Sequence, residues 1–252
     1  MRAEKPEGEL FSYVEIETST ACNLRCAYCP NSMSDRGLVK NNRQMPEALF
    51  RRLVDELVDL GFNGEFHPHF YNEPLLDERL PRLLGYVRER LPLCRIVVFT
   101  NGVRLTLEKY LELTAAGINA LIVTRHTRDE PPDMARIEAH RRQMGDAGID
   151  IEYHREGITR GIIFNRCGLV PLRKTVQNSR SCTWPSAYLT INYRGDVLLC
   201  CNDYQAEFPV GNVTSRSIRE IWEKPYNVAL RQMLRHDTGK VDICRRCQIG
   251  FF

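Results

Sequence analysis

The sequence predicts an α/β fold built around a parallel sheet, and three observations lead to this prediction. Short apolar runs typical of strands alternate with segments of helical periodicity from residue 13 to residue 154. Their spacing is that of repeated β-α units, which give parallel strands joined by right-handed crossovers. The chain has 252 residues, enough for one large α/β domain or for one domain with a small module. The pattern leaves open whether the sheet is doubly wound or curved into a barrel.

Each helix and strand expected between residues 13 and 154 has its own sequence signal. Strands are expected at residues 13–17, 64–70, 95–100, 120–124 and 149–154, and helices at residues 45–60, 77–91, 106–116 and 133–147. In the first helix, leucines recur at helical spacing, as Leu49, Leu53 and Leu57 show. Pro46 suits the first turn of that helix and Gly61 its C-cap.

The pattern changes after about residue 156. There follow a segment without a clear period, a hairpin and an interrupted helix, at residues 159–180, 188–200 and 217–235. The hairpin turns near Gly195, and Pro225 interrupts the helix. We therefore expect one α/β domain in residues 1–156. Residues 157–252 should hold the end of that domain and a small C-terminal module.

Composition restricts the partners and the cellular compartment that we expect for the chain. The net charge of +3 is too near neutral to indicate nucleic acid or an anionic membrane as a partner. No apolar run reaches eighteen residues, and the charged first ten residues lack a signal-peptide core. These features predict a cytoplasmic protein. Since thiols stay reduced there, the 10 cysteines indicate metal or redox chemistry rather than disulfides.

Three of these cysteines form a triplet directly after the first strand. Cys22, Cys26 and Cys29 have the spacing Cys-x3-Cys-x2-Cys. Three thiolates can hold three irons of a [4Fe–4S] cluster, which needs four ligands. No fourth cysteine lies nearby, so one iron would be open to bind a small molecule and pass it an electron. A partial zinc site is the alternative, but zinc favours paired cysteines that complete a set of four.

With Tyr28 before the third cysteine, the triplet resembles that of the radical S-adenosylmethionine (radical SAM) enzymes. The resemblance implies a partial, open TIM-like barrel whose cluster loop follows the first strand. It also implies that SAM binds the open iron and that its reductive cleavage gives a 5′-deoxyadenosyl radical. In such folds the site forms at the carboxyl ends of the strands.

The resemblance also implies SAM contacts after successive strands. Tyr28 would lie beside the adenine. Asn72 and Glu73 stand in Tyr71-Asn72-Glu73-Pro74, where the family has a Gly-Gly-Glu-like motif that holds the SAM amino group. Glu73 keeps the carboxylate, whereas Tyr71 and Asn72 replace the glycines.

Further polar residues end the third and fourth strands. Asn101 is placed for a SAM contact, although Asn-Gly is first a turn signal. Arg125, or its neighbour His126, could meet the SAM carboxylate or a polar substrate. His67 and His69 alternate on one strand and so share a face; we interpret both as satisfied barrel residues rather than ligands.

A second set of cysteines lies in the C-terminal part: Cys182, Cys200, Cys244 and Cys247. By spacing alone, a structural zinc site and an iron–sulfur cluster fit them equally well. The run Cys-x12-Gly-x4-Cys resembles the start of the SPASM domain, in its shortened "twitch" form with one auxiliary [4Fe–4S] cluster. The whole chain resembles the radical SAM dehydrogenases of aminocyclitol antibiotic biosynthesis.

This resemblance implies the two-electron oxidation of a secondary alcohol in a sugar-like or aminocyclitol intermediate. A fully ligated auxiliary cluster offers no open iron, but it can accept the electron that the substrate radical must lose. The catalytic cluster would take electrons from an external donor such as flavodoxin or ferredoxin. Arg166 matches an active-site arginine of the related dehydrogenases, and binding a hydroxyl or carboxylate suits it because its pKa is too high for a base.

Three alternatives stay open. Cys167 or Cys201 could donate a hydrogen atom to a substrate radical, which would make the chain an epimerase. Modification of a ribosomal peptide is common among SPASM-bearing relatives, although only about a dozen residues precede the first strand here. A zinc-stabilised binding module is the non-catalytic alternative. Cys94 is expected to be a small buried hydrophobe.

Overall fold

The structure, a computed structural model, describes residues 10–144, 150–154, 162–177 and 180–251. Its centre is an eight-stranded sheet in the order β10-β9-β8-β1-β2-β3-β4-β5. The strands are β1 (Tyr13–Ile16), β2 (Glu65–His67), β3 (Arg95–Thr100), β4 (Ala120–Thr124), β5 (Asp150–His154), β8 (Tyr188–Ile191), β9 (Asp196–Leu198) and β10 (Pro209–Asn212). The run from β8 to β5 is parallel, and β8, β9 and β10 pair antiparallel. The sheet is mostly parallel and not closed, as the sequence predicts.

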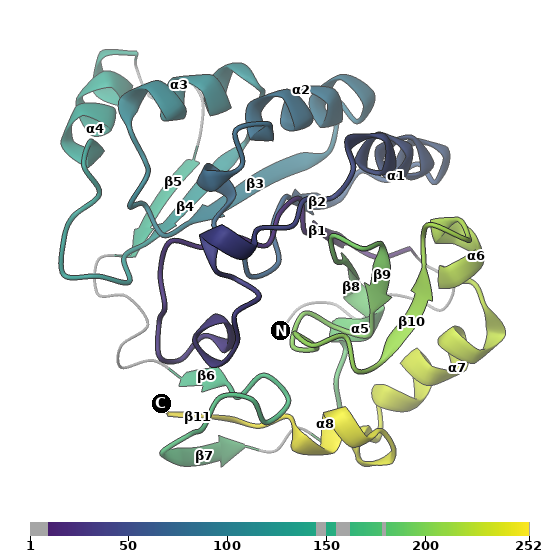
Figure 1. Ribbon diagram of the computed structural model, residues 1–252. Helices are drawn as coiled ribbons and strands as arrows, with labels where there is room; N and C mark the ends of the chain where they lie inside the picture. The colour runs from purple at the N-terminus through teal and green to yellow at the C-terminus, as the bar shows by residue number, and fades with distance from the viewer. Residues whose placement is uncertain (1–9, 145–149, 155–161, 178–179, 252) are drawn as a thin grey trace.

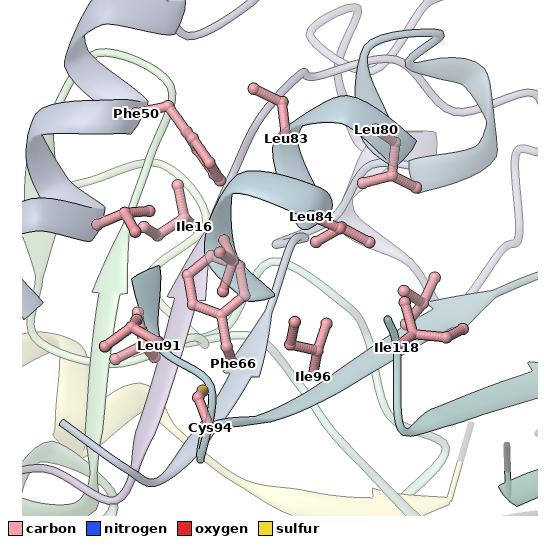
Figure 2. Close-up of a cluster of buried hydrophobic side chains, with 14 of the residues drawn as sticks. Ile16, Phe50, Phe66, Leu80, Leu83, Leu84, Leu91, Cys94, Ile96 and Ile118 are labelled. Atoms are coloured by element: carbon pink, nitrogen blue, oxygen red, sulfur yellow. The ribbon is translucent and has the colours of Figure 1, made fainter. Parts of the chain in front are cut away.

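Four helices form the crossovers of the parallel part and cover one face of the sheet (Figure 1). They are α1 (Glu47–Asp59), α2 (Leu80–Arg90), α3 (Leu107–Ala115) and α4 (Met134–Gln143). Figure 2 shows the core between these helices and the sheet, where Phe50 and Leu84 from helices meet Phe66 and Ile96 from strands. Cys94 lies in the same core with 1% of its surface exposed, so its expected role as a buried hydrophobe is confirmed.

The C-terminal part adds short elements around the hairpin of β8 and β9. Its helices are α5 (Trp184–Ala187), α6 (Ile218–Trp222), α7 (Pro225–Leu234) and α8 (Asp242–Arg246). A second, antiparallel sheet has the order β6-β11-β7, from β6 (Ile162–Phe164), β7 (Lys174–Gln177) and β11 (Ile249–Phe251). Short 3-10 helices complete the description: η1 (Pro30–Met33), η2 (Val39–Asn41), η3 (Pro74–Leu76) and η4 (Thr238–Lys240).

The elements differ from the sequence prediction mainly after residue 156. The segment interpreted as lacking a period contains β6 and β7, whose pairing partner β11 is 72 to 89 residues away in the chain. The predicted helix at residues 217–235 is two helices, because Pro225 starts α7. The predicted boundary between residues 156 and 157 lies outside the described residues. In the described ranges, no helix has the length and apolarity needed to cross a bilayer.

Candidate functional site

A cavity of about 340 Å³ opens where the parallel strands end. The sequence predicts a site at this edge, since α/β folds bind ligands at the carboxyl ends of their strands. Its wall combines the loop after β1 with the ends of β2, β3 and β4 and with the segment around β6. Among its lining residues are Cys22, Cys29, Glu73, Asn101, His126 and Arg166. Residues from both parts of the chain therefore meet in one site.

The loop that carries the triplet is fixed to the sheet by a buried ion pair. Glu17, directly after β1, has no exposed side-chain surface, and both its oxygens accept bonds of 2.6 Å from Arg36 Nη2. The N–H of Tyr193 donates to the same carboxylate at 3.1 Å. Arg36 lies over the ring of Tyr204, 4.8 Å from its centroid. The loop thus has a defined position relative to the strand ends.

Cys22, Cys26 and Cys29 line the cavity as free thiols, and none of the other cysteines in the described ranges lines it. The N–H of Leu24 points to Cys22 Sγ at 3.5 Å. Burial raises the pKa of Cys22 to about 12 and also raises the pKa of Cys26 and Cys29. These thiols must therefore release protons when they bind iron. Three thiols without a fourth fit a [4Fe–4S] cluster that leaves one iron to another ligand.

Glu73, whose carboxylate is expected to bind the SAM amino group, is buried and accepts hydrogen bonds from nearby residues. Its Oε1 accepts from Thr100 Oγ1 at 2.6 Å and from Leu75 N at 3.1 Å. Its Oε2 accepts from Asn101 N at 2.8 Å. A carboxylate accepts about four hydrogen bonds, so one position on Oε2 is open. Beside it, the buried Nδ2 of Asn72 has no hydrogen-bond partner among the described residues. An open acceptor next to an open donor fits the amino and carboxylate groups of SAM.

Asn101 holds the triplet loop rather than facing the cavity freely. Its Nδ2 donates to Asn23 Oδ1 at 2.9 Å and lies 3.9 Å from Cys22 Sγ. Its Oδ1 accepts from the N–H of Val103 at 3.0 Å. Both ends of this amide are therefore engaged. The predicted direct contact of Asn101 with SAM stays a prediction, and the structure gives the residue a positioning role.

At the end of β4, the structure separates the two neighbours that the sequence left as alternatives. Arg125 does not line the cavity and pairs with Glu130 at 2.8 Å. His126 lines the cavity, and its Nδ1 shares a hydrogen bond with the hydroxyl of Tyr28. Tyr28 lies on the cavity wall, as its expected place beside the adenine requires. These contacts favour His126 over Arg125 for a ligand contact.

The predicted strand at residues 64–70 is shorter in the structure: β2 ends at His67, and His69 lies two residues beyond it, with ring centroids 5.7 Å apart. His67 is satisfied by Glu65, whose Oε1 lies 2.7 Å from Nε2. The interpretation of His69 as satisfied was wrong: it lines the cavity, and its buried Nδ1 has no partner in the described part of the chain. Burial lowers the pKa of His69 to about 3, so its imidazole is neutral. The alternation could not reveal this, because His69 lies beyond the end of β2.

The second set of cysteines gathers at the C-terminal part. Cys200 is half-buried and lies within electrostatic reach of Cys182, Cys244 and Cys247, and burial raises the pKa of its thiol. Hydrogen bonds position two of them: Cys182 N donates to Leu234 O at 2.8 Å, and Cys247 N donates to Cys244 O at 3.1 Å. In the described ranges, no three His, Cys, Asp or Glu side chains are placed to hold a single metal ion. Four thiols with wider spacing fit a polynuclear cluster.

A fifth thiol lies at this set. Cys167 is 4% exposed, and its backbone carbonyl accepts a hydrogen bond of 3.1 Å from Arg246 Nη1. Cys201 packs near Phe70, Leu198 and Tyr204. Neither cysteine lines the cavity that holds the triplet. The catalytic roles predicted for these two thiols remain predictions.

Arg166 lies between the two sets of cysteines. It lines the cavity, and its Nη1 donates to Asn202 Oδ1 at 2.6 Å, while its buried Nε has no partner among the described residues. Burial lowers its pKa, but Tyr71 and the nearby thiols, including Cys29 and Cys247, raise it by more. The guanidinium therefore stays charged between the triplet and the C-terminal set.

Two tyrosines that the sequence analysis did not assign connect the two parts of the chain. The hydroxyl of Tyr71 donates to Cys201 O at 2.8 Å. The hydroxyl of Tyr204 lies 2.8 Å from both Asn31 Oδ1 and Ser34 Oγ, in the triplet loop. The only sequence signal for Tyr71 was that a bulky residue replaces a glycine of the family motif. No sequence signal pointed to Tyr204.

Comparison with known proteins identifies the family. The model of the radical SAM superfamily matches residues 16–160, more than half of the chain. The chain belongs to the radical SAM superfamily. A model of the SPASM iron–sulfur cluster-binding domain matches residues 182–248. This radical SAM protein is therefore an enzyme that uses SAM and [4Fe–4S] clusters, which replaces the alternative of a zinc-stabilised binding module.

Relatives of similar length refine this assignment. The chain is 33% identical to the S-adenosyl-L-methionine-dependent 2-deoxy-scyllo-inosamine dehydrogenase of Niallia circulans, over 95% of this chain and 93% of the relative. It is 24% identical to a PqqA peptide cyclase of Streptomyces rochei, over 82% of this chain and 74% of the relative. A crystal structure of BtrN in complex with AdoMet and 2-DOIA has 31% identity and a TM-score of 0.80, covering 95% of this chain and 93% of that one. The predictions of an open radical SAM barrel and of a radical SAM oxidoreductase are confirmed.

Proposed function

We propose that this enzyme oxidises a secondary alcohol on an aminocyclitol or similar polyhydroxylated ring to a ketone. The observation that carries the proposal is the full-length similarity to a dehydrogenase of 2-deoxy-scyllo-inosamine. The alternative of peptide modification is supported by a less similar relative, a peptide cyclase at 24% identity. A natural-product pathway, such as antibiotic biosynthesis, and a small-molecule substrate follow from the same similarity. An external one-electron donor such as flavodoxin or ferredoxin would reduce the catalytic cluster.

The cavity has the polar character that such a substrate needs. Buried polar groups are normally hydrogen-bonded, so unpartnered ones in a cavity wall are positions where a ligand can bind. His69 offers a neutral imidazole with a free Nδ1, and Arg166 offers a free Nε–H. Both line the cavity. We infer that these two residues bind substrate hydroxyls.

Our assignment gives Cys22, Cys26 and Cys29 to the catalytic cluster, and Asn72 and Glu73 to the amino-acid end of SAM. When bound, these groups would supply the one-electron chemistry that removes a hydrogen atom from the substrate carbon. The alcohol must then lose one proton and one electron. The charged guanidinium of Arg166 stabilises negative charge on the oxygen as its proton leaves.

The C-terminal cysteines would hold the group that accepts the electron lost by the substrate. Cys182, Cys200, Cys244 and Cys247 would hold an auxiliary cluster with no open iron, in position to take up the electron. Arg166 lies beside thiols of both sets, so the substrate site and the auxiliary site are neighbours. In the described part of the chain, the only thiols in the cavity wall belong to the triplet. This favours oxidation over epimerisation, which needs a separate thiol near the substrate radical.

Anaerobic incubation of the reconstituted enzyme with SAM, a reductant and candidate aminocyclitols tests the proposal. We expect 5′-deoxyadenosine and a ketone in equal amounts. Cys201→Ala serves as the matched control and should give the same ratio. An alcohol with inverted configuration that carries solvent deuterium, absent in Cys201→Ala, would instead establish an epimerase. A modified peptide in a parallel incubation would establish peptide chemistry.

A further inference from the structure

We propose that an acidic one-electron carrier protein docks on an exposed basic surface beside the C-terminal cysteines and takes up the electron of the auxiliary cluster. We call this surface the basic face; around the apolar side chains of Val176 and Phe251 it carries Arg173, Lys174, Arg180, Lys240 and Arg245. This docking surface rests on the auxiliary cluster of the proposed function and goes beyond it, because it gives the electron an outlet. Without an outlet the cluster would stay reduced after one turnover.

Positive charge is concentrated in the two segments that contain three of the four C-terminal cysteines. Residues 162–182 contain four Lys or Arg and no Asp or Glu, and residues 231–251 contain five Lys or Arg and two Asp. The net charge of these segments is therefore +7, whereas that of the whole chain is +3, so the remaining residues sum to −4. Such an asymmetry steers an acidic partner towards one part of the surface.

Most cations of the basic face have no acidic partner. Four of them are exposed and form no ion pair with any residue that the structure describes: Arg173, Lys174, Arg180 and Lys240. Arg245 pairs with Asp242 at 2.6 Å, but their side chains are 61% and 67% exposed, so water screens this pair. The positive charge of the face is thus largely uncompensated and can attract a partner.

Hydrogen bonds join the two segments into one continuous surface. Thr238 N donates to Arg180 O at 3.0 Å, which places Arg180 beside η4, the short helix that ends at Lys240. Arg173 N donates to Phe251 O at 2.8 Å. The cations therefore belong to one surface that extends from the small sheet to η4.

The small sheet of β6, β11 and β7, at the lower edge of the molecule in Figure 1, presents the apolar centre of this face. Gly250 pairs with Ile163, which is 7% exposed and lines the cavity, so this side of the sheet faces inwards. The next residue, Phe251, is 40% exposed and lies opposite Lys174 in the register. Since neighbouring side chains of a strand point to opposite sides, Phe251 and Lys174 share the outer side. Val176 of β7 is also exposed, and exposed aromatic and apolar side chains are typical of the centre of a protein interface.

The basic face lies next to three of the C-terminal cysteines. Arg180 precedes Cys182 by two residues, and Arg245 directly follows Cys244. Cys182, Cys244 and Cys247 are all half-buried, so a cluster held by them would lie close to the surface. Electron transfer between proteins is rapid only over short distances, so a carrier must dock where the donor is near the surface. The basic face meets this requirement.

The electron balance defines the partner. Each oxidation leaves one electron on the auxiliary cluster, which returns to its oxidised form when an oxidised carrier takes that electron; no bond forms or breaks in this step. A carrier with acidic residues around its redox centre, such as an acidic flavodoxin, matches the basic face in charge. Electron-transfer encounters bury little surface, so a small apolar centre is sufficient. A nucleic acid would match the charge but offers no redox centre.

The test measures electron transfer from the full chain with Cys22, Cys26 and Cys29 replaced by alanine, so that only the auxiliary cluster is present. The reduced protein is freed of reductant and mixed in a stopped-flow instrument with an oxidised acidic flavodoxin. The absorbance of the flavin semiquinone gives the second-order rate constant at several ionic strengths. Iron per chain is measured in parallel.

Three double variants of this parent are compared. Two alter the basic face in different segments, so that one stays informative if the other disturbs cluster assembly: Arg173→Glu with Lys174→Glu, and Arg180→Glu with Lys240→Glu. The matched control is Arg216→Glu with Arg219→Glu, since both arginines are exposed at or near α6 and their reversal lowers the net charge equally.

We expect all three variants to keep the iron content of the parent. Each variant of the basic face should lower the rate constant about tenfold at low ionic strength, because electrostatic steering raises association rates by about 10- to 1000-fold. Both should also weaken its dependence on salt, since salt screens the charges that steer the partner. The control should stay within about twofold of the parent.

Equal rate constants in the parent and in both variants of the basic face would overturn the inference. An equal loss in the control would overturn it too, because net charge alone would then explain the effect. Without transfer to flavodoxin, binding of duplex DNA or of phosphatidylserine vesicles that Arg173→Glu with Lys174→Glu abolishes would assign the surface to a nucleic acid or a membrane. A dimer in sedimentation that the same variant dissociates would assign it to a second copy of this chain.

This measurement contains no substrate, so its failure differs from a failure of the proposed function. If the holoenzyme formed 5′-deoxyadenosine without a ketone, the proposed oxidation would be refuted while the rate constants still tested the docking surface. A parent without auxiliary iron would refute both.

Discussion

Arg36→Ala would leave the carboxylate of Glu17 buried without its cationic partner. The two side chains meet at 2.6 Å, and their exposed fractions are 22% for Arg36 and 0% for Glu17. Removal of one partner from a buried pair costs about 3 to 5 kcal/mol, because the other charge stays in the interior. Glu17 keeps the N–H of Tyr193 and Arg36 is partly exposed, so the lower end applies. The lost stacking of the guanidinium on Tyr204 adds about 0.5 to 1 kcal/mol.

The total of about 3.5 to 4 kcal/mol lowers the melting temperature by roughly 7 to 16 °C for a chain of this size. Differential scanning calorimetry of the anaerobic holoenzyme measures the shift. Arg219→Ala is the matched control, since the pair of Arg219 and Glu223 is about half exposed and should contribute about 0.5 kcal/mol. Adding Glu17→Gln to Arg36→Ala should recover part of the loss, because it removes the unpaired charge. If Arg36→Ala and Arg219→Ala melted at the same temperature, the buried pair would not anchor the triplet loop.

Three further predictions concern the cavity and its supports. Tyr204→Phe should destabilise the protein by about 1 to 2 kcal/mol, because Asn31 and a serine lose their shared hydroxyl; denaturant unfolding measures this, and an unchanged midpoint would contradict it. Asn101→Ala should weaken SAM binding about fivefold in equilibrium dialysis, because the triplet loop loses its bond to Asn23; equal affinity would leave Asn101 without a positioning role. The pKa of His69 is lowered to about 3, so the unfolded chain binds the extra proton and stability should fall by about 1 kcal/mol from pH 7 to pH 5.5. His69→Gln should remove that component from the pH dependence of unfolding, and an identical pH profile would refute the assignment.

The first part of the fold was predictable because its signals are local. The predicted strands at residues 95–100 and 120–124 coincide with β3 and β4. Helix periodicity and capping residues gave α1 and α3 to within about two residues at each end. The triplet was recognisable for the same reason, since all three cysteines lie in one short loop. The spacing of residues close together in the sequence thus predicted the cysteine triplet as well as the secondary structure.

The parts that were missed depend on distant partners. β6 and β7 are strands only because β11 pairs with both, and nothing within residues 159–180 announces this. The free Nδ1 of His69 follows from the three-dimensional packing, which satisfies His67 in β2 and not the histidine two residues beyond it. The hydrogen bond from Arg246 to the carbonyl of Cys167 joins residues 79 positions apart. Such relations cannot be read from spacing.

The pairing of β1 with β8 has a consequence for biogenesis. Tyr13 lies opposite Tyr188, so the second strand from which the triplet loop gains support is made late in translation. Contacts between such distant residues are slow to form and leave apolar strand edges exposed in the meantime. The loop that receives the catalytic iron is therefore completed only when most of the polypeptide has left the ribosome. Iron–sulfur loading of this enzyme should be a post-translational event, and a nascent chain stalled before residue 188 should not accept a cluster.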